Sequence, residues 1–511
     1  MKLGPDLLFA AGNVDLVDAF NSENNWLLQI CLEKEWAGLV LDCDRDNSKS
    51  TTGYVFALAG GAVSWVSKLQ SNINQDHNKL PPGPPKLPII GNMHQMLGPL
   101  PHRILQKLSK RYGPIMHLKL GEISHVIVSS PAVAREIMKT RDPNFADRAI
   151  SATTKIEEVH NLMLSISSSH GSVVNLSQKI IPMINTILTR FAIGDKWKDQ
   201  AEFLSTMKDV VSNAAGNDLS DLFPSLSWLM CLISRPKVKV LEECFKKVDP
   251  VIEGIIQQHK DKRTNQGEGG KDCKNDNLVD ILIGLQERDL QFEIDADCIK
   301  AVILDIIGAG SETSSTVILW AMSELMKNPR VMKRVQSEMR EILKGKAAVT
   351  ETDTKQLTYL HLVIKETLRL HAPAALLLPQ VCQKTTEVHG YVIQEKTRVI
   401  VNTWAIGRDP LYWEDAEEFK PERFEGSLID YKGEGFELLA FGAGRRTCPG
   451  MIFGLADVEL PLAQMLYYFD WELPDGVESD DLDMSETYGL TARRKSDLCL
   501  RAISRIPYVE V

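Results

Sequence analysis

One cysteine of this chain stands in a setting that can give a thiol chemistry, the segment "FGAGRRTCPG" at residues 441–450. Gly442 and Gly444 permit backbone turns that other residues rarely adopt. Pro449 suits the first turn of a helix, and the apolar residues after it follow helical spacing. A helix N-terminus favours the thiolate form of a cysteine through its dipole and its free amides. We therefore interpret Cys448 as a ligand-binding thiol and not as a buried structural cysteine.

A second candidate is the apolar segment "AVILDIIGAGSETSSTVILWAM", which places glycines and hydroxyl residues midway along a predicted helix. Each glycine costs about 1 kcal/mol relative to alanine in a helix interior, and serine or threonine there bonds back to preceding carbonyls. Two interpretations remain open. The helix packs closely against a neighbour through its small residues, or it borders a ligand groove with Glu312 and Thr313 as a proton-carrying pair.

A third candidate is the charge pair in "KETLRL", where Glu366 and Arg369 are three residues apart and share a helix face. Such pairs usually sit on solvated surfaces, where they contribute little. Apolar residues surround this one, so we expect it to be drawn inside the protein. A buried pair needs further partners to be tolerated, and Arg423 in "KPERF" offers one.

Composition restricts the class of protein that can hold these residues. The 511 residues can bury a large core, and 44% hydrophobic with 25% charged residues is typical of a globular protein. A formal charge of −10 argues against broad nucleic-acid binding, which needs a basic face. Nine scattered cysteines without CxxC pairs indicate neither a disulfide scaffold nor a zinc site, and they fit a reducing compartment.

The N-terminal part gives no sign of a membrane anchor. The first residues lack the basic flank and unbroken apolar run of a signal peptide. The best candidate span, "YVFALAGGAVSWV" at residues 54–66, is short against the roughly 20 residues of a spanning helix, and we expect a β-hairpin there. The proline-rich stretch that follows, residues 71–92, favours an extended linker.

Beyond the prolines the pattern predicts a mainly α protein with a small β portion. "LPHRILQKLSKRYG" has helical spacing, and "PIMHLKLG" with "SHVIVSS" alternates as a hairpin does. Most segments after Glu157 are helical, short strands return between residues 376 and 402, and the charged, Gly-rich segment at 263–277 is expected to be an exposed loop.

The three motifs in this order resemble the cytochrome P-450 superfamily of haem-thiolate monooxygenases. Further segments strengthen the resemblance, which covers most of the chain from Lys79 onward: "LPPGPPKLPIIGNMHQ", "KETLRLHAP", "NTWAIGRDPLYW" and "PERF". They look like the plant microsomal branch, close to enzymes that oxidise terpenoids and related apolar metabolites. The resemblance implies the cytochrome P-450 fold.

It also implies roles for the residues singled out above. Cys448 would be the axial thiolate of haem b, and Glu312 with Thr313 would deliver protons on the oxygen side. The other haem-contacting residues would be Arg446 at a propionate, Phe441, Gly442, Gly444, Gly450, Ala309 and Gly310. The structural triad beneath the haem would be Glu366, Arg369 and Arg423. Substrate-contacting positions would be Ile306, Leu376, Leu377 and Leu378, which suit an apolar small molecule.

The same resemblance implies partners and a location. Electrons would come from NADPH through an NADPH-cytochrome reductase, the second substrate would be O2, and no nucleic acid would bind. The family works at the cytosolic face of the endoplasmic reticulum membrane. Without a clear anchor, this chain would be cytosolic or would contact the membrane peripherally through the apolar surface after the proline segment.

One departure from the family lies after about residue 155. There the family has a loop and a helix whose tryptophan and arginine hold the haem propionates. This chain has no tryptophan between Trp65 and Trp197 and no arginine between Arg148 and Arg190. On the order of forty residues are predicted to be absent, with edges uncertain by a few residues. The alternative to an active enzyme is therefore a non-catalytic, chimeric or truncated member that does not hold haem.

The other departures are an unusual N-terminus and two single residues. Residues 35–70 resemble a ribonuclease H fragment of a copia-type retroelement, with Glu35 where that pattern has Asp, and we expect no nuclease activity. We therefore divide the chain into a retroelement-like extension (1–75), a proline-rich linker (76–92) and a haem-thiolate domain (93–511). Gln380 stands where the family usually has Arg, and Ala440 where it usually has Pro.

Overall fold

The computed structural model describes residues 80–88, 90–96, 100–121, 123–130, 133, 152–169, 171–194, 200–214, 223, 227–266, 277–286, 294–346, 348–431, 435–489 and 491–508. The retroelement-like segment and the hairpin predicted at residues 54–66 lie outside these residues. The side chains of some residues within the helices, including residues 152–154 of the first long one, also lie outside them.

Helices make up most of the described chain, as the sequence predicts. The longer ones are α5 (Pro101–Tyr112), α7 (Ala152–Ser167), α8 (Leu176–Ile193), α9 (Gln200–Ala214), α11 (Ser227–Gln266), α12 (Leu278–Gln286), α13 (Ala296–Lys327), α14 (Pro329–Ile342), α16 (Thr358–Leu370) and α18 (Met451–Tyr468). Short helices are α15 (Glu351–Thr354) and α17 (Thr403–Ile406), with 3-10 turns at Met93–Met96, Pro421–Phe424, Gly444–Arg446 and Ser479–Asp481.

The largest sheet has the strand order β1-β2-β7-β4, formed by β1 (Ile115–Leu120), β2 (Ile123–Val128), β7 (Arg398–Val401) and β4 (Gln380–Val381). β1 and β2 form the predicted antiparallel hairpin, whereas β2 runs parallel to β7 from a distant part of the sequence. The predicted strands between residues 376 and 402 are thereby confirmed as β4, β7 and the two-stranded pair β5 (Thr386–Val388) and β6 (Tyr391–Ile393).

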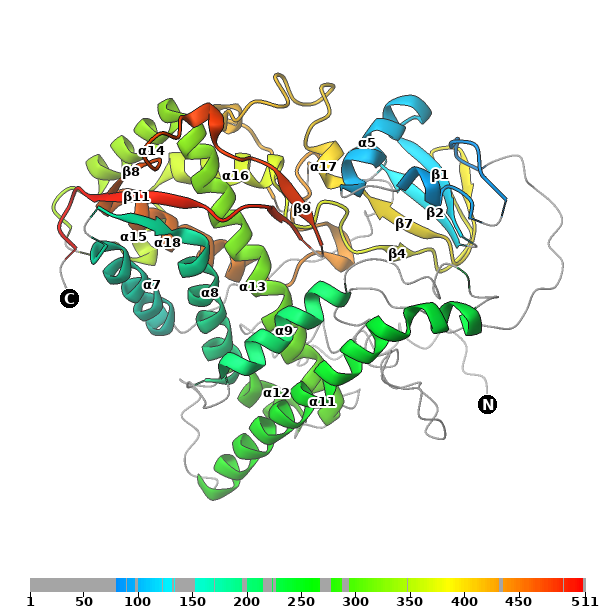
Figure 1. The fold of residues 1–511 in the computed structure, drawn as a ribbon, viewed down its shortest axis with the longest axis horizontal. Coiled ribbons are helices and arrows are strands. Elements are labelled where there is room, and N and C mark those ends of the chain that lie inside the picture. The colour runs from blue at the N-terminus through cyan, green and yellow to red at the C-terminus, as the bar shows by residue number, and fades with distance from the viewer. Residues whose placement is uncertain are drawn as a thin grey trace, which may run out of the picture.

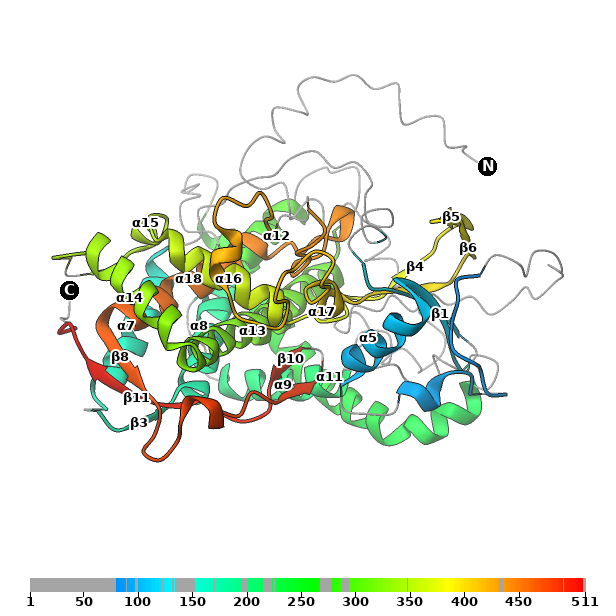
Figure 2. The same ribbon diagram turned by 90° about the horizontal axis from the view of Figure 1, so that it is seen from above.

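Two small sheets hold the C-terminal part of the chain against the helices. β11 (Cys499–Ser504) pairs with β3 (Val173–Asn175) on one side and with β8 (Phe469–Glu472) on the other. β10 (Ala492–Arg494) pairs with β9 (Glu486–Tyr488) in a short antiparallel hairpin. Figures 1 and 2 show the β1-β2-β7-β4 sheet at one end of the molecule and the helical bundle with β11 at the other.

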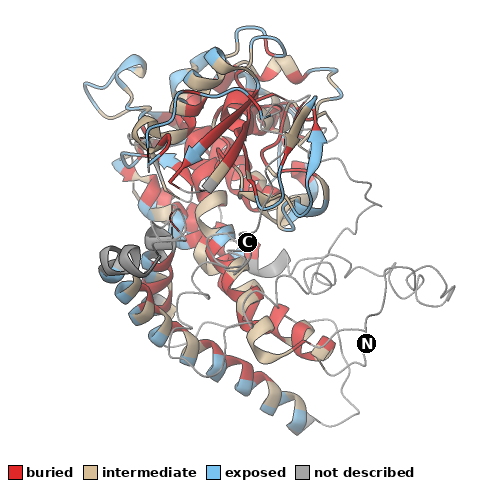
Figure 3. Cartoon of the chain, turned by 90° about the vertical axis from the view of Figure 1, so that its right-hand side faces the viewer, coloured by how far each residue is buried: buried red, intermediate tan, exposed pale blue. Residues whose placement is uncertain are grey.

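Helix α13 connects the two halves of the helical part and is its central element. It contacts α8, α16 and α18, which with α7 and α14 enclose the largest hydrophobic core. Figure 3 shows the buried residues gathered in the interior, with exposed residues on the outer faces of the helices. Within the described chain, α13 alone is long and apolar enough to cross a membrane, and 61% of its most apolar window is buried by neighbouring elements. Burial of this kind is typical of the central helix of a packed domain.

The described part of the proline-rich segment is packed against the sheet, which differs from the predicted linker. The N–H of His117 donates to the carbonyl of Pro82 over 2.9 Å, and Asn92 is completely buried. Gly83 is required here, because a Cβ at this position would lie 2.0 Å from the carbonyl oxygen of His117. Residues 80–92 therefore join the edge of the domain. A second difference is that α11 continues to Gln266, through the start of the loop predicted at 263–277.

Candidate functional site

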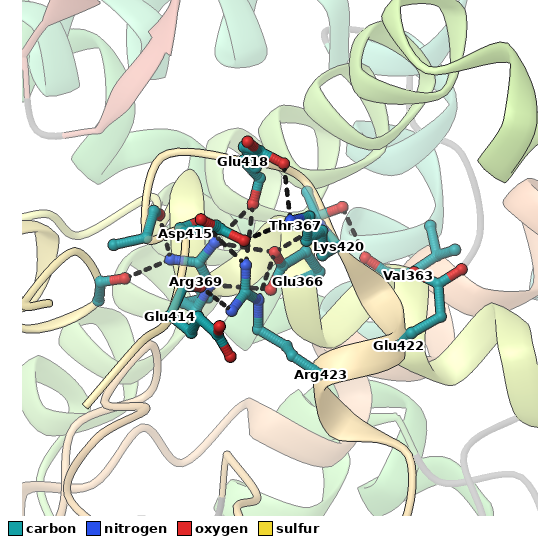
Figure 4. A network of polar contacts seen from close by, with 12 residues as sticks. Val363, Glu366, Thr367, Arg369, Glu414, Asp415, Glu418, Lys420, Glu422 and Arg423 are labelled. Atoms are coloured by element: carbon teal, nitrogen blue, oxygen red, sulfur yellow. Dashed lines mark hydrogen bonds and ion pairs between the residues drawn. The ribbon is translucent and has the colours of Figure 1, made fainter.

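The charge pair predicted from "KETLRL" lies fully inside the protein on helix α16. Glu366 and Arg369 are 0% and 1% exposed. The two Glu366 oxygens accept hydrogen bonds from Nε and Nη2 of Arg369, both at 2.8 Å. Arg423, on the 3-10 turn at Pro421–Phe424, donates from Nε to Glu366 Oε1 over 2.9 Å. The structure thus brings the three predicted residues together, as Figure 4 shows.

The remaining donors of this network are satisfied by backbone carbonyls of residues 407–418, which the sequence did not predict. Arg369 Nη1 donates to the carbonyl of Ala416 over 2.7 Å, and Arg423 Nη1 donates to that of Glu414 over 2.6 Å. The N–H of Lys420 donates to Glu366 Oε1 over 2.8 Å. Because buried charges are tolerated only when their hydrogen bonds are complete, this network fixes the chain that follows α17 onto α16.

The Cys448 segment forms a tight loop that ends at the start of α18. Gly442 and Gly444 both have φ of 70°, in the left-handed region that favours glycine. The N–H of Cys448 donates back to the carbonyl of Phe441 over 2.8 Å, closing the loop. Helix α18 then begins at Met451, close to where the sequence predicted it. The loop geometry accounts for the glycines that flank the cysteine.

The protonation state of the free Cys448 thiol differs from the prediction. The residue is exposed to solvent, yet protein atoms surround the sulfur closely enough for desolvation to raise the pKa of the thiol. A hydrogen bond from the Gly450 N–H lowers this pKa by a smaller amount. The predicted effect of the helix N-terminus on the pKa is present in the hydrogen bond from the Gly450 N–H, but desolvation outweighs it for the free thiol. A metal ion changes this balance, because a coordinating thiol is deprotonated outright.

Helix α13 passes beside the N-terminal turn of α18 and so beside the cysteine loop. A Cβ on Gly454 would lie 3.6 Å from the hydroxyl oxygen of Ser314, so the two helices are in van der Waals contact there. Thr313, the residue before Ser314, donates from Oγ1 to the carbonyl of Ala309 over 2.8 Å. Ala309 is exposed although most of this helix is buried. The middle of α13 therefore presents an open face near the cysteine loop.

Gly310 lies at a close packing contact between helices α13 and α8. A Cβ at Gly310 would lie 3.0 and 3.1 Å from the two terminal carbons of Leu188 on α8. These distances are tighter than ordinary contacts, so the glycine allows α8 and α13 to approach closely. Of the two interpretations that the sequence left open for this segment, close packing therefore applies at Gly310. Ala309, one residue earlier, is exposed, so the second interpretation, a ligand groove beside this helix, applies there as a prediction.

Glu312 has a charged partner that the sequence did not indicate. Its Oε1 lies 3.4 Å from Nη1 of Arg493 on β10, and the two side chains are 24% and 47% exposed. Nothing in the local pattern around either residue reveals the pair, because they lie far apart along the chain and meet only through the β9–β10 hairpin.

Asp305 is a second missed residue on the same stretch of α13, one helical turn before Ala309. Burial raises the pKa of its carboxyl to about 7, with no compensating cation among the described residues. The side chain therefore carries a proton in a large fraction of molecules at neutral pH, which distinguishes it from an ordinary surface aspartate.

The predicted substrate-contacting residues do not all lie in one place. Leu376 is buried in a cluster with Leu105 and Met116, so its side chain packs in the core between α5 and the sheet, and its contact with a substrate stays a prediction. Leu378 is 48% exposed, and Ile306 packs at the junction of two core clusters. Leu377 has φ of 48°, a strained conformation for leucine.

The residues around the cysteine loop fit a haem group. The only protein ligand needed, an accessible thiol, is Cys448, and Arg446 two residues before it is an exposed cation on the same loop. The exposed Ala309 provides a small, apolar surface on the neighbouring helix, where a flat macrocycle needs room. Arg446 has polar interactions of its own in this structure. No group of three or more His, Cys, Asp or Glu side chains that could hold a metal ion occurs in the described residues.

Comparison with known proteins decides which family this site belongs to. A family model described as "Cytochrome P450" matches residues 81–181 and 156–500. The chain belongs to the cytochrome P450 family. Its fold is that of a P450 monooxygenase, and the family implies a haem with a thiolate-ligated iron.

Curated relatives of this P450 are plant enzymes. The chain is 45% identical over 472 residues to "Desmethyl-deoxy-podophyllotoxin synthase" of Sinopodophyllum hexandrum, covering 84% of this chain and 92% of the relative. It is 44% identical over 478 residues to "Premnaspirodiene oxygenase" of Hyoscyamus muticus, covering 84% and 94%. "Tabersonine 16-hydroxylase 2" of Catharanthus roseus is 43% identical over 485 residues, covering 85% and 94%.

A solved structure shows the fold of this P450 independently. It is described as "Zebra fish cytochrome P450 another structure with Progesterone", with a TM-score of 0.64 and 22% sequence identity. It covers 79% of this chain and 99% of that chain, so the similarity extends over the whole domain. At this level of identity the comparison supports the fold and nothing finer.

The alignments also bear on the segment predicted to be missing after about residue 155. The alignment with the podophyllotoxin-type synthase has 472 positions but spans only 84% of a 511-residue chain. The aligned part of this chain, 84% of 511 residues, is shorter than the 472 positions of the alignment. The remaining positions are residues of that relative with no counterpart in this P450. The two family matches overlap at residues 156–181, directly after the predicted gap.

Proposed function

We propose that this P450 is a haem-thiolate monooxygenase that inserts one oxygen atom from O2 into an apolar small molecule such as a terpenoid. Electrons would come from NADPH through a partner NADPH-cytochrome reductase. The observation that carries the proposal is the contact of Gly454 with Ser314, which sets the cysteine loop beside the open face of α13. This arrangement supports the proposal, because Cys448 would then ligate haem beside Glu312 and Thr313 on the neighbouring helix.

In this proposal each part of the cysteine loop has a role in holding haem b. Cys448 would ligate the haem iron and Arg446 would bind a propionate. Phe441 and the glycines of the loop, Gly442, Gly444 and Gly450, shape the surface against which the macrocycle lies. When bound, the haem supplies the oxygen chemistry, and electron donation by the thiolate favours O–O cleavage. The buried network of Glu366, Arg369 and Arg423 would be the structural triad on the side of α16.

On the other side, α13 supplies the residues that handle protons and substrate. The Thr313 hydroxyl and the Glu312 side chain would carry protons beside Ala309 and Gly310. Ile306 and Leu378 are the apolar residues best placed to contact a substrate, because Ile306 is partly buried on α13 and Leu378 is exposed. An apolar substrate is also supported by a relative named "Premnaspirodiene oxygenase".

We propose a location at the cytosolic face of the endoplasmic reticulum membrane. The described residues around the first prolines include three exposed, large apolar side chains, Leu80, Leu87 and Ile90, at 36%, 48% and 38%. Exposed apolar groups of this kind favour contact with a membrane surface or with another protein. These exposed side chains support a peripheral contact of the protein with the membrane surface.

A second candidate function is a non-catalytic family member that does not hold haem. The observation that favours it is the missing segment, since the family's tryptophan and arginine for the propionates have no counterpart between residues 149 and 189. Arg446 is then the one propionate partner named above that this chain retains.

The reduced, carbon-monoxide-bound absorption spectrum of the expressed chain distinguishes the two. We expect the strongly red-shifted Soret band of thiolate-ligated haem, lost in Cys448→Ser and kept in the matched control Cys382→Ser. Cys382 is partly buried at the end of β4 and is remote in sequence from the loop. A folded wild-type chain that shows no such band with haem supplied would contradict the monooxygenase and favour the non-catalytic candidate.

A further inference from the structure

One side of helix α13 is left partly open over about three turns. Ala301, Asp305 and Glu312 are half-buried there and Ala309 is exposed, whereas most of the helix around them is buried. Their spacing along the chain places the four side chains on one face of the helix. These four residues form the α13 strip, in which two small alanines alternate with two acids.

Asp305 is the polar residue of the α13 strip that has no partner among the described residues. It makes no hydrogen bond or ion pair with them, and burial alone accounts for the raised pKa of its carboxyl. Glu312, by contrast, lies 3.4 Å from a guanidinium. A desolvated polar group without a hydrogen bond is unfavourable, so the Asp305 carboxyl gains from a ligand that supplies one.

The charged side chains of the helices packed against α13 do not compensate Asp305. Helices α11 and α12 contact the N-terminal half of α13, and their charges are engaged elsewhere. The pairs are Lys300 of α13 with Asp249 and Glu253 of α11, and His259 of α11 with Asp280 of α12. A buried carboxyl without a nearby cation keeps its proton more readily than an ordinary aspartate, and in that form it donates a hydrogen bond.

The position of Asp305 on α13 determines which part of a ligand it can contact. It lies one helical turn, about 6 Å, before Ala309. It is also the end of the pair further from the cysteine loop, because α18 approaches α13 at Ser314. Ile306, next to it, packs at the junction of two apolar clusters. A ligand on the α13 strip therefore meets an apolar surface with one hydrogen-bond donor at the end away from the loop.

We infer that Asp305 is a specificity-determining residue, which donates a hydrogen bond to a carbonyl or hydroxyl oxygen of the substrate. That oxygen lies about one helical turn from the part of the substrate held near Ala309. A hydrocarbon of the same shape leaves the Asp305 carboxyl unpaired, and a site that can form a hydrogen bond discriminates against such a ligand. The inference rests on the proposed monooxygenase function and narrows its substrates to apolar molecules that already bear an oxygen.

Ligand binding tests this role without turnover. Two matched pairs of different size, p-menthane with menthone and androstane with androstanone, are titrated into the haem-loaded chain, and the change in haem absorption gives each Kd. We expect the wild type to bind the ketone of at least one pair about tenfold more tightly than the hydrocarbon. Asp305→Leu should lose this preference. Asp305→Asn keeps an N–H donor and should retain most of it.

The pH dependence distinguishes hydrogen-bond donation from a purely structural effect of Asp305. Its pKa is about 7, and its carboxyl donates only while it is protonated. The preference of the wild type for the ketone should therefore be largest below this pKa and fall as the pH rises through it. The preference of Asp305→Asn should not change with pH.

Asp297→Asn is the matched control on the same helix. Asp297 is 38% exposed and lies 4.0 Å from Lys300, outside the α13 strip. This variant should leave the ratio of the two Kd values unchanged. If Asp305→Leu does not fold, the comparison of the wild type with Asp305→Asn across pH decides alone.

Several outcomes would overturn the role of Asp305. They are equal Kd values for ketone and hydrocarbon in the wild type, a preference that persists in Asp305→Leu, and no binding of any of the four compounds to the haem-loaded chain. Tighter binding of menthylamine than of menthone, increasing at high pH, would also overturn it, because that marks a carboxylate that binds cations. A folded wild-type chain without the reduced carbon-monoxide band overturns the proposed function instead. The shift of the thermal midpoint with the same compounds then tests Asp305 in the haem-free chain.

Discussion

At the scale of single residues, Glu366 carries the most consequential charge in this protein. It is 0% exposed and accepts hydrogen bonds from two arginines and from the N–H of Lys420. Neutralising it leaves Arg369 buried with its cation uncompensated, and breaking a buried pair from one side typically costs 3 to 5 kcal/mol. The network therefore stabilises the fold independently of any role in an active site.

We expect Glu366→Gln to lower the free energy of unfolding by about 3 kcal/mol or more, or to prevent folding, as measured by urea denaturation. The matched control is Glu425→Gln, which removes an acid that is 48% exposed and pairs with Arg334. Exposed pairs contribute about 0 to 1 kcal/mol, so the control should be nearly neutral. Equal effects of the two variants would contradict the assignment of a special role to the buried network.

At the scale of elements, the contact of α8 with α13 depends on a residue without a side chain. Gly310 lies against the end of the Leu188 side chain, and the polar side chain of Asn185, one turn earlier on α8, accepts a hydrogen bond from Ser311. The glycine thus serves packing, although it weakens the helix by about 1 kcal/mol relative to alanine.

Gly310→Ala is expected to lower the free energy of unfolding by about 1 kcal/mol, because overpacking costs about 1 to 3 kcal/mol and exceeds the gain in helix propensity. Gly254→Ala in α11 is the matched control, since a Cβ there meets no atom within 4 Å. It should raise stability by up to about 1 kcal/mol. Chemical denaturation of the two variants should therefore give opposite signs, and a stabilising Gly310→Ala would show that Leu188 yields without cost.

At the scale of the whole molecule, the main core includes the helix that follows the predicted gap. Val159 and Met163 of α7 are completely buried in the main core, so this helix is not left without a partner. Lys155, at the start of α7, is 0% exposed and lies 2.9 Å from Asp457 of α18. Burial raises the pKa of Asp457 to about 6, and Lys155 opposes this shift. The segment after the gap is therefore joined to the helix that carries the cysteine loop.

We expect from this packing of α7 that the chain folds and gains stability from haem. A ligand that binds only the folded state at 100 times its Kd stabilises it by about 2.7 kcal/mol. We expect haem to raise the thermal midpoint of the wild type by a few degrees and that of Cys448→Ala by less. Scanning calorimetry with and without haem checks this. Equal midpoints in all four samples would show that Cys448 does not hold haem.

Much of the candidate site could be predicted from the sequence because its geometry is local. The turns around Cys448 follow from its glycines, and α18 begins close to the position that Pro449 indicated. The three charged residues of the buried network were recognised from an i to i+3 spacing and a nearby arginine. Their further hydrogen bonds to backbone carbonyls could not be predicted, because every residue has a carbonyl and the residue types do not show which ones lie close.

Tertiary structure decided what depends on the approach of distant segments. The sequence left the role of Gly310 open, and the structure shows Leu188 of α8 packed against it. The burial of Leu376 in a core cluster is likewise visible only in the fold. Glu312 met Arg493 only through the β9–β10 hairpin. The direction of the Cys448 pKa was also misjudged, because desolvation depends on all the atoms around the sulfur. The sequence by itself determined most elements and the family, and it singled out Cys448 as the candidate ligand, since these depend on local pattern and residue chemistry. Packing, pairing at a distance and desolvation were decided by the fold, because each is a property of neighbours that the chain brings together only when folded.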